Sequence, residues 1–286
     1  MVILLENDIL RVQIDTLGGR LSSIQTKSND LEYLWQKSKF PHLFPVVGRL
    51  HEKRYTINGA SYPMEMHGFL RNTEMHVVAQ DKCSCVLELT DTTESRASYP
   101  YTFTFRICYC LEENKLQIGF AVENHTQETL YCAMGGHPGF NVPMEKDLAF
   151  EDYELTFSKH CKPEQVVFSD NVLTTNIRLP YELEAGTRIV LRHSLFAHDA
   201  LVLKDTSSSV TISSPKGKHG VRVDYPQMPY VGFWQYDKGE PQFVCVEPWS
   251  ALPGREGIVE ALDTMPDLTE IEAGECSQNE WSITVW

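Results

Sequence analysis

Residues 101–123 read YTFTFRICYCLEENKLQIGFAVE, the clearest structural signal in this chain. Apolar and polar side chains alternate over residues 101–111, which predicts a β-strand with one buried face, because successive strand side chains point to opposite sides. Glu113-Asn114 then turns the chain, and LQIGFAVE at residues 116–123 predicts a second strand. Two long strands joined by so short a turn predict an antiparallel pair.

Shorter strand patterns recur on both sides of this pair. Residues 10–15 alternate until Gly18-Gly19 breaks the pattern, and a further strand from Leu21 completes a predicted hairpin. Residues 54–57 lead into Asn58-Gly59, a pair favoured in tight two-residue turns because both positions tolerate positive φ. Other strands are predicted over residues 75–78, 86–90, 154–157, 189–191, 200–203, 210–213, 221–225, 231–235, 243–246 and 281–286.

Helical signals are few. Residues 194–197 fit a short helical turn, and no long segment has the apolar spacing of an amphipathic helix. No Gly/Ser-rich or Pro-rich linker divides the 286 residues, which are enough to bury one large core. The sequence therefore predicts an all-β fold, a large antiparallel β-sandwich with few short helices, in a single domain over residues 1–286.

The charge balance limits the partners of the protein. With 25 Lys and Arg against 39 Asp and Glu, the formal net charge is -14, which opposes nonspecific binding to nucleic acid or anionic membranes. The N-terminal MVILLENDILR has a short apolar run with no basic segment ahead of it, so neither a signal peptide nor a membrane anchor is expected. We expect a cytoplasmic protein with no nucleic-acid or membrane partner.

The eight cysteines include two C-x-C pairs, Cys83/Cys85 and Cys108/Cys110. A strand points both members of such a pair to one face, so four thiols would meet if the two strands were neighbours. Zinc sites usually space their cysteines more widely, on turns, and the pattern therefore favours buried free thiols over a metal site. Free thiols fit a reducing compartment.

The motif GGHPGFNVP, at residues 135–143, sets His137 among glycines. Glycines let the backbone approach a ligand closely, and Pro138 fixes the turn, so the ring is expected at a strand end with little bulk shielding it. The structural alternative is a turn histidine that bonds a backbone carbonyl.

A second motif, VCVEPWS at residues 244–250, sets Glu247 at the end of an alternating strand. The rigid Pro248 beside the large ring of Trp249 is a way to desolvate and aim the carboxylate. The alternative is a solvated carboxylate at a strand end. Taken together, His137 and Glu247 predict an acid–base pair.

Further candidate residues lie beside glycines or ahead of a strand. FPVVGRL and MHGFLRN supply Arg49, His67 and Arg71, and arginine donates in a fixed fork suited to vicinal hydroxyls, carboxylates or phosphates. Asp199, in FAHDALVL, could accept from sugar hydroxyls. Surface ion pairs for the arginines and a turn cap for Asp199 are the structural alternatives.

The motifs HGFLR, GGHPGFN and VCVEPW, in this order, resemble those of the aldose 1-epimerase (galactose mutarotase-like) family, and specifically its branch of bacterial LacX-type proteins. The similarity runs through most of the chain, including the closing LTEIEAGECSQNEWSITVW. It implies a large β-sandwich whose concave face binds a monosaccharide. It also implies an isomerase that interconverts the α and β anomers of an aldohexose by opening and reclosing the ring, with no cofactor and no metal.

The resemblance also implies roles for single residues. His137 corresponds to the general acid and Glu247 to the general base, Arg49 and His67 resemble substrate-binding residues, and Asp199 resembles the sugar-binding aspartate. We expect the carboxylate to raise the pKa of His137, so that imidazolium and carboxylate coexist. Activity would then fall in acid as Glu247 is protonated and in alkali as His137 loses its proton.

Some positions depart from the galactose mutarotases, which usually carry asparagine and tyrosine where this chain has Gly136 and Gly139 and do not follow the base with Pro248-Trp249. HGFLR is closer to the hexose-6-phosphate mutarotases. The alternatives are therefore a hexose-6-phosphate 1-epimerase, with Arg71 or Arg49 as phosphate clamp, and a non-catalytic carbohydrate-binding protein on the same fold. Glycoside hydrolysis normally needs two carboxylates and ranks last. We expect a monomer or a weak homodimer.

Overall fold

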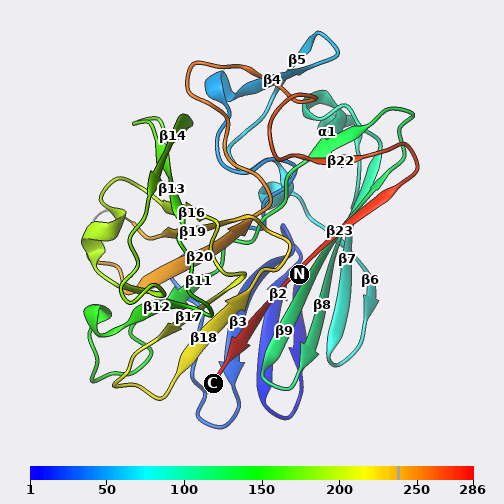
Figure 1. Ribbon diagram of the computed structural model, residues 1–286. Helices are drawn as coiled ribbons and strands as arrows, with labels where there is room; N and C mark the ends of the chain where they lie inside the picture. Colours follow the sequence, from blue (N-terminus) through cyan, green and yellow to red (C-terminus); the bar gives the residue numbers. More distant parts are fainter. Residues whose placement is uncertain (237–238) are drawn as a thin grey trace.

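β-Strands dominate the computed structural model, which describes residues 1–236 and 239–286 (Figure 1). Two large antiparallel sheets account for most of them. The nine-stranded main sheet has the order β15 (Arg188–Val190), β12 (Glu154–Phe157), β17 (Ser209–Ser213), β18 (Gly220–Asp224), β23 (Cys276–Val285), β9 (Lys115–Asn124), β8 (Phe103–Glu112), β7 (Ser84–Thr90) and β6 (His76–Gln80). The six-stranded second sheet has the order β11 (Gly139–Asn141), β20 (Phe243–Trp249), β19 (Tyr230–Trp234), β16 (Leu201–Lys204), β13 (Glu164–Phe168) and β14 (Thr174–Pro180).

Three small sheets and a few short helices complete the fold. The small sheets are β1 (Val2–Glu6), β2 (Leu10–Asp15) and β3 (Arg20–Thr26); β21 (Glu260–Ala261), β4 (Arg54–Ile57) and β5 (Ala60–Pro63); and β10 (Leu130–Cys132) with β22 (Thr269–Ile271). The helices are α1 (Thr93–Ser98) and the 3₁₀ turns His51–Lys53, Leu70–Asn72, Phe150–Asp152 and His193–Phe196. Across residues 1–236 and 239–286, every helix is too short or too polar to cross a lipid bilayer.

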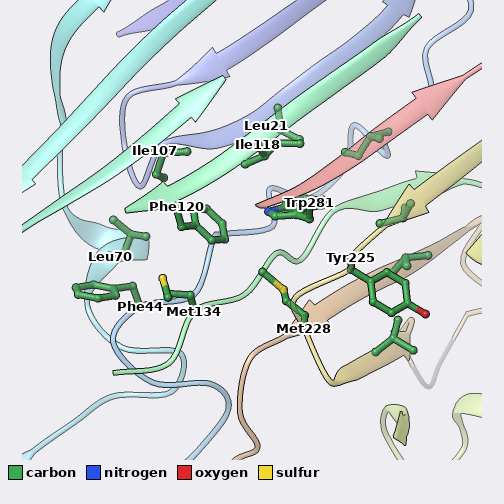
Figure 2. Close-up of a cluster of buried hydrophobic side chains, with 14 of the residues drawn as sticks. Leu21, Phe44, Leu70, Ile107, Ile118, Phe120, Met134, Tyr225, Met228 and Trp281 are labelled. Carbon is green, nitrogen blue, oxygen red and sulfur yellow. The ribbon is translucent and has the colours of Figure 1, made fainter. Parts of the chain in front are cut away.

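The predicted antiparallel pair lies in the main sheet and lines the core. β8 pairs with β9 along its whole length, and the inward-facing residues of both strands are buried. Figure 2 shows Ile107, Ile118 and Phe120 from this pair in one buried cluster with Trp281 of β23. The rings of Phe120 and Trp281 have centroids 6.4 Å apart. Burying each such side chain stabilises the fold by roughly 1.5–3 kcal/mol.

Strand β23 lies inside the main sheet, between β18 and β9. It is antiparallel to both, pairing Val285 with Val221 on one side and Cys276 with Glu123 on the other. The sequence pattern predicted a strand only over residues 281–286. β23 therefore joins two parts of the main sheet that are far apart along the chain.

Strand β20 is buried on both faces. The prediction was an alternating strand that ends just before Glu247, but the strand runs on to Trp249 and all seven of its residues are buried. Val244 and Val246 pack into the main core, whereas Trp249 packs into a second, smaller apolar cluster. Glu247 pairs with Gly232 of β19 and is almost fully buried, so it lies inside the protein rather than at its rim.

Most of the predicted strands are present, with small shifts at their ends. Residues 10–15, 54–57 and 154–157 coincide with β2, β4 and β12, and the helical turn near residues 194–197 is the 3₁₀ turn His193–Phe196. Asn58-Gly59 forms the expected turn between β4 and β5, with φ of 50° and 76°. The strands that no local sequence pattern indicated are β1, β10, β11, β13, β14, β21 and β22.

The prediction that four thiols could meet is wrong. The β7/β8 register sets Cys85 opposite Tyr109, so Cys85 faces the core while Cys108 and Cys110 lie on the outer face. All eight cysteines are free thiols, as expected, although Cys108 and Cys276 are exposed rather than buried.

Candidate active site

The pairing of β11 with β20 brings His137 and Glu247 together. β11 begins two residues after His137 and lies antiparallel to β20. The residue just before β11 also contacts β20, because the Val246 N–H donates a hydrogen bond to the carbonyl of Pro138 at 3.1 Å. As a result, Nε2 of His137 lies 3.3 Å from Oε2 of Glu247.

His137 is enclosed, so the expectation of a ring with little bulk around it is wrong. Only 11% of its side chain is exposed. Phe40 stacks on the imidazole with ring centroids 5.2 Å apart and nearly parallel planes, and Trp234 meets it edge-on at 5.8 Å. These aromatic rings shield the imidazole from water.

The glycines beside His137 make room for aromatic rings rather than for a ligand. A Cβ at Gly139 would lie 2.2 Å from the ring of Phe40, and a Cβ at Gly136 would lie 2.5 Å from the ring of Trp281. Any side chain at these positions would displace one of the two rings. The two glycines thus allow aromatic rings to pack close to His137, and these rings shield the imidazole from water.

Burial sets the charge state of the pair. Glu247 is 2% exposed, and desolvation raises its pKa well above 4.5. The negative charge of Asp199 raises this pKa further, whereas the nearby Trp249 indole lowers it without forming a hydrogen bond. Desolvation lowers the pKa of His137 to about 4; its own carbonyl opposes this shift and Arg71 adds to it. This direction is opposite to the expected rise in the histidine pKa, because burial dominates and a protonated Glu247 carries no charge to stabilise the imidazolium. Both directions favour a resting pair that keeps its proton on Glu247.

A cavity of about 300 Å³ opens beside the pair. This volume falls at the lower end of the range for small-molecule sites. The structure brings together on its walls all six residues that the sequence singled out, namely His137, Glu247, Arg49, His67, Arg71 and Asp199.

His67 is fixed by the backbone. Its Nδ1 accepts the N–H of Gly48 at 3.1 Å, and the residue adopts a left-handed φ of 65°. Desolvation lowers the pKa of His67 well below 6.5, with the charge of His137 adding to the shift, so the ring is neutral and carries its proton on Nε2. The rings of His67 and His137 are nearly perpendicular, with centroids 5.7 Å apart. A ligand that contacts His137 would thus lie near a hydrogen-bond donor.

The arginines and Asp199 bring charges of both signs to the cavity. Arg49 is exposed and donates to the carbonyl of Asn171 at 3.2 Å, whereas Arg71 is partly buried. Asp199 has a φ of 75° and accepts the N–H of Ala200 at 2.8 Å, which is the turn contact that its position suggested. Its carboxylate nevertheless borders the cavity.

Four aromatic residues of the cavity wall were missed. Phe40, Phe168, Trp234 and Tyr236 all line it. The signal for two of them is the run FWQY at residues 233–236, whose alternate side chains point to the same side of an extended chain. Phe40 lies in an irregular segment, so no periodicity indicated that it would reach His137.

A third group with metal-ligating chemistry adjoins the pair. Alternation along β20 puts Cys245 on the same face as Glu247, and ligand atoms of these two residues and His137 lie within 4.8 Å of one another, the one such set among the described residues. Burial and the charge of Glu247 raise the pKa of the Cys245 thiol well above 9.0. Because metals bind the thiolate, the set favours a packed, protonated thiol over a metal ion.

Comparison with known proteins adds to this geometry. A sequence profile of the aldose 1-epimerase family matches residues 1–264. The chromosomal protein LacX of Lactococcus lactis subsp. lactis is 32% identical over 300 aligned positions, which cover 100% of this chain and 99% of the relative. A galactose mutarotase related enzyme from Lactobacillus acidophilus is 30% identical with a TM-score of 0.95, covering 100% of this chain and 97% of that one. A galactose mutarotase-like protein from Lactobacillus casei ATCC 334 shares the fold, with a TM-score of 0.94 at 24% identity over the full length of both chains. These matches confirm the resemblance and the fold class that the sequence predicted.

Proposed function

The chain belongs to the aldose 1-epimerase family, and from this membership we propose that it is a cofactor-independent mutarotase for a free aldohexose. The acid–base pair is His137 and Glu247. The observation that carries the proposal is their 3.3 Å contact on the wall of a cavity of about 300 Å³. One group that holds a proton and one that accepts a proton lie side by side, where a sugar ring can reach both.

The reaction needs one proton donor and one proton acceptor. Glu247 removes the proton from the anomeric hydroxyl while His137 donates a proton to the ring oxygen, so the bond from C1 to the ring oxygen breaks and an aldehyde forms. Rotation about the C1–C2 bond exposes the other face of the aldehyde, and reclosure runs both transfers in reverse. General acid–base catalysis of this kind contributes on the order of 10²–10⁴-fold per group.

The neutral resting pair can supply these roles. A protonated Glu247 beside a neutral His137 holds the same number of protons as an ionised Glu247 beside an imidazolium. The proton needs only to cross the 3.3 Å contact. Hydroxyl groups of a bound sugar stabilise the carboxylate by donating hydrogen bonds to it, so binding favours the charged form that starts the reaction.

The other cavity residues hold the sugar. His67 donates from Nε2, while Arg49 and Arg71 donate to hydroxyl or ring oxygens, and Asp199 accepts from hydroxyl groups. Trp234 offers an aromatic face to the apolar C–H groups of the ring. Together these groups keep the open-chain form in place until it recloses.

The direct test is polarimetry on freshly dissolved α-glucose and α-galactose. The purified protein should speed the approach to anomeric equilibrium in proportion to its concentration, well above the spontaneous rate in the same buffer. A non-catalytic sugar-binding protein would bind the same sugars and leave that rate at background.

The pH dependence of kcat/KM should reflect the neutral pair. Below the His137 pKa of about 4 both groups are protonated, no acceptor remains and the rate should fall. On the alkaline side the rate should fall when Glu247, whose pKa is raised well above 4.5, loses the only proton of the pair. Initial rates between about pH 3 and 9 locate both limbs, because kcat/KM reports the groups of the free enzyme. An acid limb with its midpoint near the ordinary histidine pKa of 6.5 would contradict the neutral pair.

A second candidate, favoured by the two arginines in the cavity, is a hexose-6-phosphate 1-epimerase. Arginine binds phosphate through paired hydrogen bonds. Under our proposal, inorganic phosphate at about 10 mM, above the usual range of KM values, should leave the rate on free hexose unchanged. Competitive inhibition that Arg71→Gln abolishes, together with a higher kcat/KM for glucose 6-phosphate than for glucose, would favour the phosphorylated substrate instead.

A further inference from the structure

A second, much smaller cavity adjoins His137, and we infer that it holds ordered water that joins this residue to His42, which makes His42 a positioning residue of the acid–base pair. The water site follows from the cavity and its polar atoms alone. The effect of His42 on catalysis rests on the proposed function, because His42 acts through His137.

The walls of the small cavity carry polar atoms without partners. Nine buried side-chain nitrogen and oxygen atoms have no hydrogen-bond partner among the described residues. Four of them belong to residues that line this one cavity, namely Ser22 Oγ, Trp35 Nε1, His42 Nδ1 and His137 Nδ1. Because leaving a buried polar atom unpaired is costly, such atoms usually contact bound water. Their gathering around one cavity therefore indicates a small polar ligand.

The size of the cavity fits water and excludes a sugar. Its volume is about 40 Å³. A buried water needs at least roughly 10–15 Å³ and roughly two to four polar partners, so the cavity has room for up to about three waters. Gln36 and Lys39 border the cavity and are exposed, so water can enter it from the surface.

The backbone holds the two histidines in adjoining segments. Leu43 and Gly135 form an antiparallel bridge, with hydrogen bonds of 2.9 and 3.2 Å. His42 directly precedes one end of this bridge, and His137 lies two residues beyond the other end. Glu247 contacts Nε2 of His137 and lines only the sugar cavity, which leaves Nδ1 of His137 to the small cavity.

His42 presents a hydrogen-bond acceptor to the small cavity. Tyr109 of β8 donates its single hydroxyl hydrogen to the carbonyl of Gly19. Nε2 of His42 lies 2.5 Å from the same hydroxyl and must therefore be the donor in that contact. Burial lowers the pKa of His42 to about 3, and a neutral imidazole carries only one ring hydrogen. Nδ1 of His42 is thus left as an acceptor.

His137 presents a donor to the same cavity. In the resting pair the protonated Glu247 donates to Nε2 of His137 across 3.3 Å, so the one ring hydrogen of the neutral His137 lies on Nδ1. Water that accepts from this nitrogen can donate to Nδ1 of His42. The indole of Trp35 adds a second donor and the hydroxyl of Ser22 a second acceptor, which matches the two bonds of each kind that water forms.

The resulting chain of hydrogen bonds runs in one direction, from Nδ1 of His137 through water to His42, Tyr109 and the carbonyl of Gly19. The bond at Nδ1 fixes the tautomer of His137 that leaves Nε2 free to exchange the proton with Glu247. It also stabilises the imidazolium that forms in this exchange, because a charged donor bonds more strongly than a neutral one. His42 therefore favours the charged form of the pair that starts the reaction.

Two measurements on the unmodified protein test the chain directly. A high-resolution crystal structure should show ordered water within hydrogen-bond reach of Nδ1 in both His42 and His137. Nitrogen NMR of isotope-labelled histidines at neutral pH should find the ring hydrogen of His42 on Nε2 and that of His137 on Nδ1, with signals assigned by their loss in His42→Gln and His137→Gln. A cavity without water, or either ring with its hydrogen on the other nitrogen, would overturn the inference.

A matched pair of variants tests the role of His42 in catalysis. The amide of asparagine is bonded to Cβ and reaches the position of Nδ1, whereas the longer glutamine reaches the position of Nε2. His42→Gln loses the acceptor for the water, so its kcat should fall about tenfold, the equivalent of one hydrogen bond of ordinary strength, with KM unchanged. His42→Asn keeps an acceptor there and should keep most of kcat, although it loses the contact with Tyr109.

A purely structural role predicts the opposite order. His42→Gln would then be the better variant, because it keeps the buried contact with the Tyr109 hydroxyl. Urea unfolding of both variants shows how much stability each one loses. Equal kcat values, or a higher kcat for His42→Gln, would show that His42 only supports the fold.

The two proposals fail in different ways. If no sugar is converted faster than in buffer, the proposed function is wrong, while the crystal structure and the NMR spectra still decide the water site. If glucose is converted but the water, the tautomers or the order of the two variants differ from those expected, the mutarotase proposal stands and the positioning role of His42 is wrong.

Discussion

Glu247→Gln should lower kcat/KM for mutarotation by about 10²–10⁴-fold, because the amide can neither accept the anomeric proton nor hold the proton of the resting pair. The fold should survive. A carboxyl whose pKa is raised by burial is protonated in the native state while the unfolded chain has already ionised, so above pH 4.5 it lowers the stability of the native state. Glutamine is neutral at every pH and removes this loss.

The measurement pairs polarimetry with urea unfolding at neutral pH. The unfolding midpoint of Glu247→Gln should be equal to or above that of the parent protein, which separates a chemical defect from a folding defect. Glu32→Gln is the matched control: burial also raises the pKa of Glu32, but its side chain does not line the cavity, so activity should be retained. The loss of one general base should cost more than about tenfold in activity. A Glu247→Gln variant that stays within about tenfold of the parent protein would therefore rule out the assigned role.

Gly68→Ala should lower the free energy of unfolding by about 3 kcal/mol or more, because it combines strained backbone with a clash that no side-chain rotation can relieve. Gly68 has a φ of +74°, and a Cβ there would lie 2.1 Å from the carbonyl oxygen of Phe44. That carbonyl belongs to backbone that packs beside His67. The variant should therefore also lose activity.

Gly59→Ala is the matched control for this change. Its φ of +76° is nearly the same, but no atom lies within 4 Å of the added Cβ. The free energy of unfolding of Gly59→Ala should fall by only about 1 kcal/mol, which is the cost of placing alanine in a left-handed backbone conformation. Urea unfolding of both variants separates the two contributions, and equal losses would show that the contact with Phe44 relaxes without cost.

The sequence predicted the parts of this protein that obey a local rule. Alternation located β8 and β9 because a half-buried strand repeats every two residues, and Asn58-Gly59 located a hairpin turn because few pairs tolerate its backbone. β14 escaped because most of its residues are exposed, which leaves little apolar alternation to detect. α1 escaped because it is short and depends on the cap formed by Thr92 and Ser95.

The site was predictable in its members but not in its electrostatics. Motifs named the six polar residues, and the fold gathers them around one cavity. Burial lowers the pKa of His137, and Phe40 and Trp234 contribute to that burial through tertiary packing that no motif records. Gly136 and Gly139, the positions that depart from the galactose mutarotases, each accommodate an aromatic ring of this chain. The single-domain organisation and the roles of the site residues stay predictions.

The central position of β23 has a consequence for how this protein acquires its activity. Its neighbours β18 and β9 cannot join into one sheet until residues from distant parts of the chain meet, and such non-local closure slows folding. β23 also carries Trp281, whose ring fits against Gly136, next to the histidine of the acid–base pair. During refolding, catalytic activity should therefore return only when the main sheet closes, which is later than the formation of the local hairpins.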